Sequence, residues 1–464
     1  MTRETDPPSL TTEIAHFVHK TDFSALPLDV LARGRVHILD GLGLALTGSK
    51  APATRILREF AGRVGGMSTA SVLGTAMRTS PPLAALINGT TMHADNFDDT
   101  SPQPSPDRNG GIHATAGVLP AVLALAEEAD LSGRKLTEAF HIGIEVACKL
   151  NHAIDPRHYA EGFHTTGTLG IFGAAVGAAK ILGLKAEGIA HALSLATARA
   201  GGVRANFGSM VEQTHAGIAA DGGVTAALLA AAGMAGGGDT LGARFGWLQA
   251  AGGGFASGAI RDRLGAPWAI VDPGTWIKPY PSGSLTHPAM TLLASMMREH
   301  GFSANNVGNL TVTTNQRLVN TLIHNNPTDA MQARFSMPFC LAVLLVTGHA
   351  GIPEFTDHMV NQADIRAMIK RIDYLPYDTV EPGYSNVTSF IEVTLSDRTR
   401  LQGRADFPRG SPDDPMSFDD VVEKFTGCAA AAGWSADKTA RTIEMVARLE
   451  RLESVRDLTA QLTS

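Results

Sequence analysis

Cysteine is scarce in this chain, and its basic residues do not cluster. The three cysteines, Cys148, Cys340 and Cys428, lie far apart in the sequence and form no CxxC pair, which argues against a disulfide framework and against zinc and iron–sulfur sites. The formal net charge is −7 at pH 7, and the lysines and arginines are scattered. Because nucleic-acid binders carry a concentrated basic surface, we predict no nucleic-acid partner and no metal, and the cysteine usage favours a reducing compartment.

The chain also lacks the marks of export and of membrane insertion. Its first residues contain acids and prolines where a signal peptide needs a basic start and an apolar run. The charge-poor stretch 217–238 contains Asp221 and consists mainly of alanine and glycine, so it predicts a buried helix rather than a membrane span. We therefore expect a cytoplasmic protein with no membrane partner.

Apolar residues recur with helical spacing through the first half of the chain. Segments with this spacing are 30–48, 82–97, 116–129, 135–153 and 186–202. The chain contains 49 glycines, several of them inside such patterns, which indicates helices packed closely through small residues. The glycines of 167–177 superficially resemble a dinucleotide-binding loop, but no apolar strand precedes them, so helix packing is the better explanation.

After residue 288 the sequence contains strand-like patterns as well as helical ones. Alternating apolar and polar residues at 309–315 and 389–406 predict half-buried strands, with helical patterns at 288–301 and 334–349. At 464 residues the chain exceeds the size at which a single core stops growing. We expect a mainly α protein with a smaller α+β domain. The predicted parts are a helical domain begun by residues 1–275, an α+β domain at 276–407, and C-terminal helices at 408–464 that return to the helical domain.

Four short segments place titratable side chains beside glycine. They contribute His93, Asp95, Asn96, Asp98, Asp99, Thr100 and His113 (92–117), His164 (160–170), Arg204, Glu212 and His215 (203–217), and Lys278, Tyr280, Ser282 and His287 (276–288). Each segment has a structural alternative: Asp98 and Asp99 can be helix caps or surface acids, and a lone histidine is more often structural than catalytic. Together the segments supply the cations and neutral donors that a carboxylate substrate needs.

Six segments, taken in order, resemble the MmgE/PrpD family. They are HADNFDDT, GIHATAGVLPAVLAL, GFHTTGTLGIFGAA, NFGSM with HAG, KPYP with THPA, and ARFSMPFCLA. Members of this family include 2-methylcitrate dehydratase, cis-aconitate decarboxylase and iminodisuccinate epimerase, which act on small di- and tricarboxylic acids without metal or organic cofactor. The resemblance covers nearly the whole chain. It implies a large helical domain made from both chain ends, an inserted α+β lid domain, no cofactor and a homodimer.

Two positions depart from the family pattern. In the family pattern His-x-x-Asp-Phe-Asp-Asp-Thr the first aspartate is Asn96 here, and an amide cannot act as a base. Asp95 is one residue away, which is about 100° around a helix, so we expect that it does not replace the aspartate. The lysine of the third segment is Glu212. Asp to Asn adds one positive unit and Lys to Glu removes two, so a pocket lined by both is one unit more negative, and a tricarboxylate should bind less well.

The matching positions imply a site. We predict His113, His164, Lys278 and Glu212 as catalytic residues, and Asn96, Thr100, Arg204, His215 and Tyr280 as substrate-binding residues. Either His113 or His164 would be the base or the acid, and Glu212 is a candidate for the missing carboxylate. Lys278, Arg204 and a histidine would stabilise the enediolate that forms when a proton leaves the carbon next to a carboxylate.

The sequence leaves several functions open. A dehydratase-like lyase of a small carboxylic acid is the first hypothesis, and an epimerase or a decarboxylase is the alternative among enzymes. A small-acid-binding protein that has kept the fold and lost catalysis is the hypothesis from another class, because of Asn96 and Glu212. The retained His113, His164 and Lys278 weigh against it, since a decayed site has little physical reason to keep polar groups in an enclosed cleft.

Overall fold

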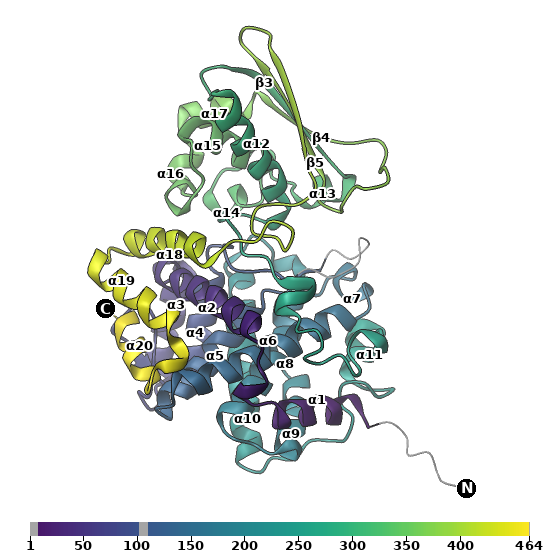
Figure 1. The fold of residues 1–464 in the computed structure, drawn as a ribbon, viewed down its shortest axis with the longest axis vertical. Coiled ribbons are helices and arrows are strands. Elements are labelled where there is room, and N and C mark those ends of the chain that lie inside the picture. Colours follow the sequence, from purple (N-terminus) through teal and green to yellow (C-terminus); the bar gives the residue numbers. More distant parts are fainter. Residues whose placement is uncertain (1–7, 102–109, 464) are drawn as a thin grey trace. The chain divides into compact units, whose positions relative to one another are not determined.

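The structure of the protein is a computed structural model that describes residues 8–101 and 110–463 (Figure 1). It divides into two compact units. Unit 1 contains the described residues up to Ala94, Asp98–Thr275, and those from Phe418 on; unit 2 contains Asp95–Phe97 and Trp276–Ser417. The proline-rich loop 102–109, which belongs to the first predicted segment, lies outside the described residues.

Unit 1 is built from helices. They are α1 (Leu10–Lys20), α2 (Leu28–Gly48), α3 (Pro52–Val64), α4 (Pro81–His93), α5 (Ala114–Glu128), α6 (Gly133–Ala153), α7 (Arg157–Ala160), α8 (Thr165–Ile181), α9 (Ala186–Thr197), α10 (Met210–Ala231), α11 (Trp247–Gly252), α18 (Phe418–Ala432), α19 (Ala436–Ala447) and α20 (Val455–Leu462). A short antiparallel hairpin joins β1 (Ala70–Ser71) to β2 (Arg78–Thr79). Helices α18 and α19 pack on α2, and α20 packs on α5, so both ends of the chain build this unit (Figure 1).

Glycine sets the distance between the central helices of unit 1. A Cβ atom on Gly173 of α8 would lie 2.5 Å from the carbonyl oxygen of Gly143 on α6, and one on Gly177 would lie 2.7 Å from Val122 on α5. Real Cβ atoms do not approach other atoms this closely, so these helices pack at a distance that only glycine allows. The glycines of 167–177 therefore serve helix packing, as predicted.

Helices α4 and α10 cross in the same way. A Cβ atom on Gly217 of α10 would lie 2.1 Å from the carbonyl oxygen of Leu86 on α4, and Gly89 meets the Cα atom of Gly217. The two helices run antiparallel, because Gln213, one turn before Gly217, donates from Nε2 to the carbonyl oxygen of Ala94 at the end of α4 (3.0 Å). The crossing thus brings the last residue of α4 next to the first turn of α10.

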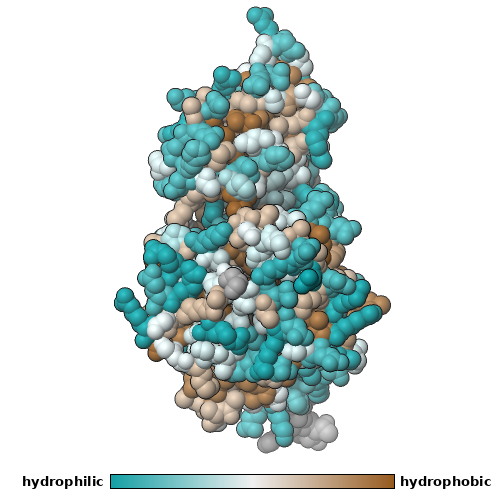
Figure 2. Space-filling model, turned by 90° about the vertical axis from the view of Figure 1, so that its left-hand side faces the viewer, coloured by the Kyte–Doolittle hydropathy of each residue, from teal (hydrophilic) through white to brown (hydrophobic). Residues whose placement is uncertain are grey.

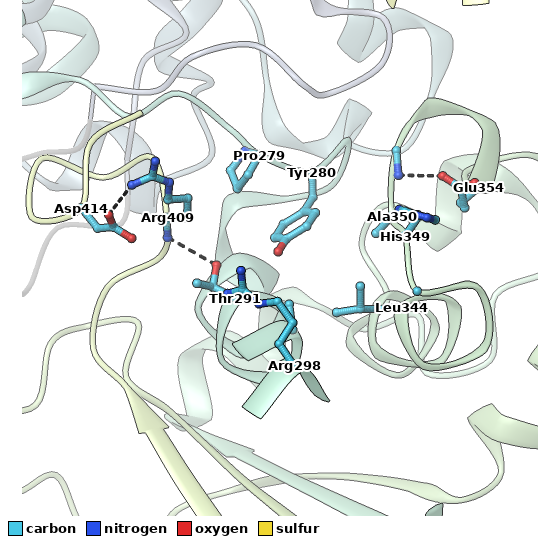
Figure 3. A pocket seen from close by; sticks show the side chains of 13 residues that line it. Pro279, Tyr280, Thr291, Arg298, Leu344, His349, Ala350, Glu354, Arg409 and Asp414 are labelled. Atoms are coloured by element: carbon cyan, nitrogen blue, oxygen red, sulfur yellow. Dashed lines mark hydrogen bonds and ion pairs between the residues drawn. The ribbon is translucent and has the colours of Figure 1, made fainter. Parts of the chain in front are cut away.

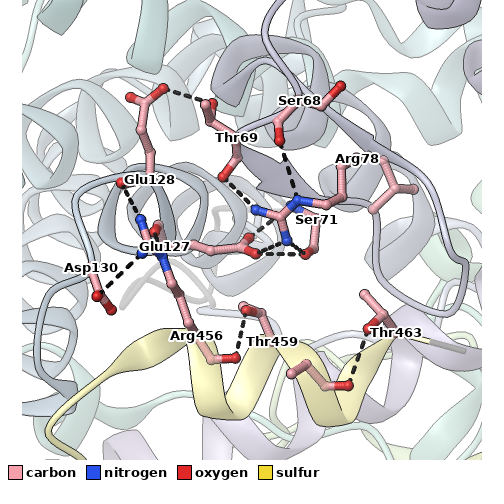
Figure 4. A network of polar contacts seen from close by, with 12 residues as sticks. Ser68, Thr69, Ser71, Arg78, Glu127, Glu128, Asp130, Arg456, Thr459 and Thr463 are labelled. Atoms are coloured by element: carbon pink, nitrogen blue, oxygen red, sulfur yellow. Dashed lines mark hydrogen bonds and ion pairs between the residues drawn. The ribbon is translucent and has the colours of Figure 1, made fainter.

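A polar network attaches the C-terminal helix α20 and the β1–β2 hairpin to the end of α5 (Figure 4). Arg456 of α20 donates to the carbonyl oxygens of Glu127 (3.0 Å) and Glu128 (2.9 Å), which are backbone acceptors in the last turn of α5. The buried Glu127 carboxylate accepts from the backbone and hydroxyl of Ser71 and pairs with Arg78 at 2.7 Å. One helix end therefore anchors both the β1–β2 hairpin and the C-terminal helix.

Unit 2 is a four-stranded sheet covered by helices. The strands are β3 (Val307–Thr314), β4 (Ile372–Pro376), β5 (Ser389–Leu395) and β6 (Arg400–Ala405), in the order β4-β3-β5-β6, with β3 and β4 parallel and the other pairs antiparallel. The helices are α12 (His287–His300), α13 (Gln316–Thr321), α14 (Ala330–Ala333), α15 (Met337–Thr347), α16 (Asp357–Val360) and α17 (Ala363–Ile369). Figure 1 shows α12, α15 and α17 on one face of the sheet, where residues of these helices and of the strands form one apolar core.

The predicted mainly α fold with a smaller α+β part is confirmed, with differences in the strands. The predicted run 389–406 is two strands, because Arg398 adopts a left-handed conformation (φ 73°) and the chain turns back between β5 and β6. Strand β4 was missed, since its five residues are too few for a clear alternation. Helix α4 also ends at His93, whereas the apolar pattern predicted helix as far as residue 97.

The surface in Figure 2 is mostly hydrophilic, with hydrophobic side chains exposed in small groups. Exposed apolar side chains include Leu28, Met67 and Phe245, and scattered ones are ordinary in soluble domains. None of the helices in the described ranges combines the length and the apolar content that crossing a bilayer requires. The predicted buried helix at 217–238 is confirmed as far as Ala231, where α10 ends; residues 232–238 lie outside the helix and most of them are exposed.

Replacing Gly217 with alanine should destabilise unit 1. The added methyl group meets the backbone of α4, which cannot move aside cheaply, so we expect the free energy of unfolding to fall by about 1–3 kcal/mol. The matched control is Gly427→Ala in α18, where a Cβ atom meets nothing within 4 Å and alanine should be neutral or stabilise by up to about 1 kcal/mol. Urea unfolding of both variants gives the comparison, and equal midpoints would show that the crossing tolerates a methyl group.

Candidate functional site: a buried histidine and carboxylate cluster

The crossing of α4 and α10 places His93 between two carboxylates. His93 Nδ1 lies 2.7 Å from Asp98 Oδ2, and Nε2 lies 3.2 Å from Glu212 Oε1. The second contact is an ion pair rather than a well-aligned hydrogen bond. All three side chains are at least 90% buried. Burial lowers the pKa of His93, but the hydrogen bond to Asp98 and the charges of Asp98 and Glu212 outweigh it and raise that pKa to about 10. At neutral pH His93 is therefore a fixed imidazolium.

His113 lies beside this ion pair with its tautomer defined. Its Nδ1 atom is 2.6 Å from the backbone carbonyl oxygen of Asp99. A carbonyl oxygen only accepts, so Nδ1 carries a hydrogen, and in the neutral ring the lone pair is on Nε2. Thr100 Oγ1 and Asp98 Oδ2 also lie near Nδ1, at 3.3 and 3.5 Å. A neutral His113 thus has the form of a base at Nε2, and a protonated one has the form of an acid.

His164 and His215 form a second pair. Their Nδ1 atoms are 2.8 Å apart, so one ring donates its proton and the other accepts it. Burial, together with the positive charge of His93, lowers the pKa of both rings, and that of His164 lies well below its usual value. The ring centroid of His93 lies 4.9 Å from that of His113 and 6.0 Å from that of His164. The four histidines therefore make one cluster.

Three helices begin at this cluster. His113 precedes α5 and His164 precedes α8 at the N-cap position, while Glu212 lies in the first turn of α10. Ser, Thr, Asp or Asn normally occupy an N-cap, and giving up their hydrogen bond costs about 0.5–2 kcal/mol. Neither histidine side chain makes a capping hydrogen bond. The positive ends of three helix dipoles favour negative charge here, which suits the two carboxylates and an anionic ligand.

Arg204 lies at the edge of the cluster. Its guanidinium covers the ring of Tyr159 at 4.0 Å and donates from Nη1 to the carbonyl oxygen of Tyr159 (2.9 Å). Phe207, which follows on the same short turn, contacts His164 with ring centroids 4.9 Å apart. Arg204 Nε is buried and has no hydrogen-bond partner among the described residues. A buried donor without a partner is costly, so this atom fits a ligand that brings its own acceptor.

Unit 2 holds a different group of predicted site residues. The buried Lys278 ammonium donates to the backbone oxygen of Asn96 (2.9 Å) and to its side-chain oxygen (2.5 Å). Asn96 has φ 50°, a left-handed conformation that asparagine tolerates better than most residues. Asp95 pairs with Arg334 at 2.8 Å. The expectation that Asp95 does not replace the missing aspartate rested on helical rotation, which is the wrong reason because α4 has already ended; Asp95 is instead engaged by Arg334.

Tyr280 lies apart from both groups of contacts. It lines a cavity within unit 2 together with Arg298, Arg409 and His349 (Figure 3). Ser282 and His287, also noted in the sequence, bond to each other next to it, and the His287 ring packs edge-on against Tyr280. Unit 1 thus brings together His113, His164, His215, Glu212, Thr100 and, at the edge, Arg204, while unit 2 holds Asn96, Lys278 and Tyr280.

The predicted set omitted the two residues at the centre of the cluster, His93 and Asp98. Both were noted in the sequence, but Asp98 and Asp99 also fitted surface or capping acids. The surface position is wrong, since both acids are buried, with Asp98 bound to His93 and Asp99 to His37 (3.1 Å). The capping role holds for Asp99, which accepts from the backbone N–H (3.3 Å) and the hydroxyl (2.9 Å) of Thr115 in the first turn of α5. The sequence feature that could have identified them is a pair of adjacent acids close to a histidine at the end of an apolar helix. Charged side chains that are buried in such a place are stable only when they are paired.

One group of side chains in the described part of the chain is compact enough to hold a metal ion: His93, Asp98 and His113, with one atom from each within 4.8 Å of the others. The observed contacts are those of hydrogen bonding. His93 Nδ1 lies 2.7 Å from Asp98, and His113 Nδ1 carries the hydrogen that it donates to Asp99. A metal would need a lone pair on each nitrogen, so the cluster as arranged fits proton transfer better than metal binding.

The fold and the cluster define a class: mainly helical proteins that keep acid and base side chains in a buried site. The chain belongs to the MmgE/PrpD family. Residues 12–258 match the MmgE/PrpD N-terminal domain, and residues 280–451 match the MmgE/PrpD C-terminal domain. The resemblance seen in the six sequence segments is thereby confirmed.

The similarity to curated proteins extends over nearly the whole chain. The chain is 28% identical to the cis-aconitate decarboxylase of Homo sapiens, over 98% of this chain and 94% of that protein. It is 26% identical to the cis-aconitate decarboxylase of Mus musculus, over 98% and 93% of the two chains. It is 23% identical to the cis-aconitate decarboxylase-like protein oryM of Aspergillus oryzae, over 100% and 99%. These relatives therefore span both matched domains.

His93 should remain an imidazolium at pH 8, because Asp98 and Glu212 stabilise its positive charge. Nitrogen-15 NMR of the histidine rings measures this, and Asp98→Asn should let that ring lose its charge at lower pH. Since the folded pKa of about 10 exceeds the ordinary histidine pKa of 6.5, the contribution to stability is complete below pH 6.5 and is lost as the pH rises through 10. A spectrum with every ring neutral at pH 8 would contradict this assignment.

Proposed function

We propose that this protein is a lyase of a small polycarboxylic acid that moves a proton at the carbon next to a carboxylate, without metal or organic cofactor. The observation that carries the proposal is the buried cluster of four histidines around the Asp98–His93–Glu212 ion pairs. Membership of the MmgE/PrpD family supports it, and so does similarity to proteins named cis-aconitate decarboxylase over nearly their full length.

Decarboxylation is the reaction to test first, because the relatives carry that name. When a β,γ-unsaturated acid loses carbon dioxide, the electrons of the broken carbon–carbon bond form a new double bond, and the old double bond takes up a proton at its far carbon. In cis-aconitate that carbon bears a carboxylate. Dehydration removes a proton from such a carbon and expels hydroxide, and epimerisation removes a proton and returns one. Each reaction therefore needs one proton donor or acceptor beside a carboxylate.

The charge state of each histidine limits the role that it can have in proton transfer. His93 stays charged at neutral pH, so its contribution is a fixed positive charge rather than proton transfer. His113 and His164 remain the candidates for acid and base, and the geometry gives each a proton partner: the Asp99 carbonyl for His113 and His215 for His164. Thr100 lies within hydrogen-bond range of His113 at 3.3 Å and is a positioning residue in this scheme.

Binding of an anionic substrate would itself favour protonation of the histidine that acts as the acid. Two carboxylates and one imidazolium leave the core of the cluster with one negative charge, while His164 and His215 are neutral at pH 7. A substrate carboxylate beside them raises their pKa and favours uptake of a proton. That proton is then available for transfer to carbon. Arg204 Nε, which is buried without a partner, is a donor for the carboxylate.

Glu212 acts through His93 in this proposal. Where the family usually has a lysine, this chain places a carboxylate 3.2 Å from the His93 ring. An additional negative charge disfavours substrates with three carboxylates, so dicarboxylates should compete well with tricarboxylates. Lys278 and Asn96 remain predicted site residues held together within unit 2. The homodimer and the cytoplasmic location remain predictions.

Proton NMR in deuterated water, with a panel of small unsaturated, hydroxy and amino di- and tricarboxylates, tests the proposal. We expect one acid of the panel, with cis-aconitate and its dicarboxylate analogues tested first, to be converted with one deuterium placed on the carbon next to a carboxylate. The product separates decarboxylation, dehydration and epimerisation.

The control for this experiment is the His113→Asn and His164→Asn double variant, which should lose conversion and keep the fold. If the whole panel stays unconverted while one member still raises the melting temperature, the lyase proposal fails. The alternative of a non-catalytic acid-binding protein, first suggested by Asn96 and Glu212, is then the better account.

A further inference from the structure

Unit 2 contains a cavity of about 640 Å³ that the proposed chemistry does not use (Figure 3). Thr291, Ala294 and Arg298 line it from α12, where their spacing of three and four residues puts them on one face. The other walls are Pro279 and Tyr280, the end of α15 with the loop 348–351, and the loop that carries Arg409 and Asp414. The volume is in the range of small-molecule sites.

Polar groups in the wall are mostly satisfied by their neighbours. Asp414 pairs with Arg409 at 2.5 Å, and the Glu354 carboxylate accepts from the backbone N–H of Gly351 at 2.7 Å (Figure 3). Asp414 is therefore paired with a cation, whereas Glu354 is held against the loop backbone and keeps its charge. Arg298 is different, because its guanidinium makes no hydrogen bond or ion pair with any residue that the structure describes. Arg298 is thus a cation of the wall without an ion-pair partner among the described residues.

Tyr280 supplies a donor next to this cation. Burial raises the pKa of the Tyr280 hydroxyl, while its hydrogen bond with Thr291 and the positive charge of Arg298 act in the opposite direction. The net pKa is raised, so the hydroxyl stays protonated at neutral pH. In Figure 3 the Tyr280 ring reaches from the wall toward α12, with its hydroxyl toward Thr291 and Arg298. A guanidinium and a phenol on one side of a cavity form a binding pair for an oxyanion.

The remaining wall is apolar. Leu344 of α15, Ala294 of α12, Pro279 and Ala350 face the same space. An anion alone would leave this surface in contact with water, whereas a ligand with an apolar body covers it. Arg298 and His349 are exposed, so the charged side of the cavity opens to solvent.

We propose that this cavity is a second ligand site, which binds an amphipathic organic acid with its carboxylate on Arg298 and Tyr280 and its apolar body against Leu344 and Ala294. None of the residues that line it belongs to the histidine cluster. Tyr280, predicted from the sequence as a residue of the substrate site, is here a residue of this separate site.

Binding of hexanoate and octanoate to the full chain, followed by saturation-transfer NMR and calorimetry, tests the proposal. Arg298→Glu reverses the charge of an exposed side chain and should weaken binding by about tenfold or more, because a charge-assisted contact is lost and a repulsive one is made. Ala294→Asp should weaken binding similarly by placing a carboxylate in the cavity. The matched control is Arg400→Glu on β6, which makes the same charge change at an exposed position outside the cavity and should leave affinity unchanged.

Three results would overturn the proposal: no binding of either acid to the wild-type chain, equal affinity in Arg298→Glu, or equal loss in Arg400→Glu. The His113→Asn and His164→Asn double variant should still bind hexanoate, because those residues lie in the other site. Loss of binding in that variant would mean that the acid occupies the histidine cluster, and would also overturn the proposal. The measurement does not need turnover, so it is independent of the lyase proposal.

Discussion

The buried ion pairs of His93 with Asp98 and Glu212 are the constraint on which the rest of the site depends. An ionised group taken out of water is costly unless it is paired, and removing one partner of a buried pair is strongly destabilising, by about 3–5 kcal/mol. Each of these three side chains therefore needs the others in place. Their fixed charges also act on the neighbouring rings, because the cation at His93 adds to burial in lowering the pKa of His164 and of His215.

The fold meets this constraint through its helix ends. The glycine crossing of α4 and α10 lets two backbones touch, which carries Glu212 to the ring of His93. Histidines at the starts of α5 and α8 turn their side chains toward the cluster instead of capping their helices. The helix dipoles that end there favour anions. The missing N-cap hydrogen bonds and the buried charges both lower the stability of the fold, as is common at functional sites.

Much of the fold and part of the site follow from the sequence. Helical periodicity and glycine content predict the helical unit, and the ordered family segments predict that His113, His164, His215 and Glu212 belong together, as unit 1 has them. The end of α4, the left-handed Asn96 and the short strand β4 depend on tertiary contacts that periodicity does not encode. Tyr280 was predicted for the substrate site from the motif that it shares with Lys278; within unit 2 it lines a separate cavity, and its part in the substrate site stays a prediction. The ionisation of His93 requires distances that no sequence contains.

The two departures from the family pattern now have physical partners: Asn96 holds Lys278, and Glu212 holds the charge on His93. We therefore infer that Glu212 contributes to the proposed reaction and is not a sign that the chain has lost catalysis. Turnover of the acid that the wild-type protein converts, measured for Glu212→Gln with the melting temperature as control, tests this claim most directly. We predict that turnover falls by about tenfold or more while the variant stays folded with a lower melting temperature, because the amide keeps the shape of the carboxylate, loses its charge and leaves His93 paired with Asp98. Unimpaired turnover in a folded Glu212→Gln variant would contradict the account.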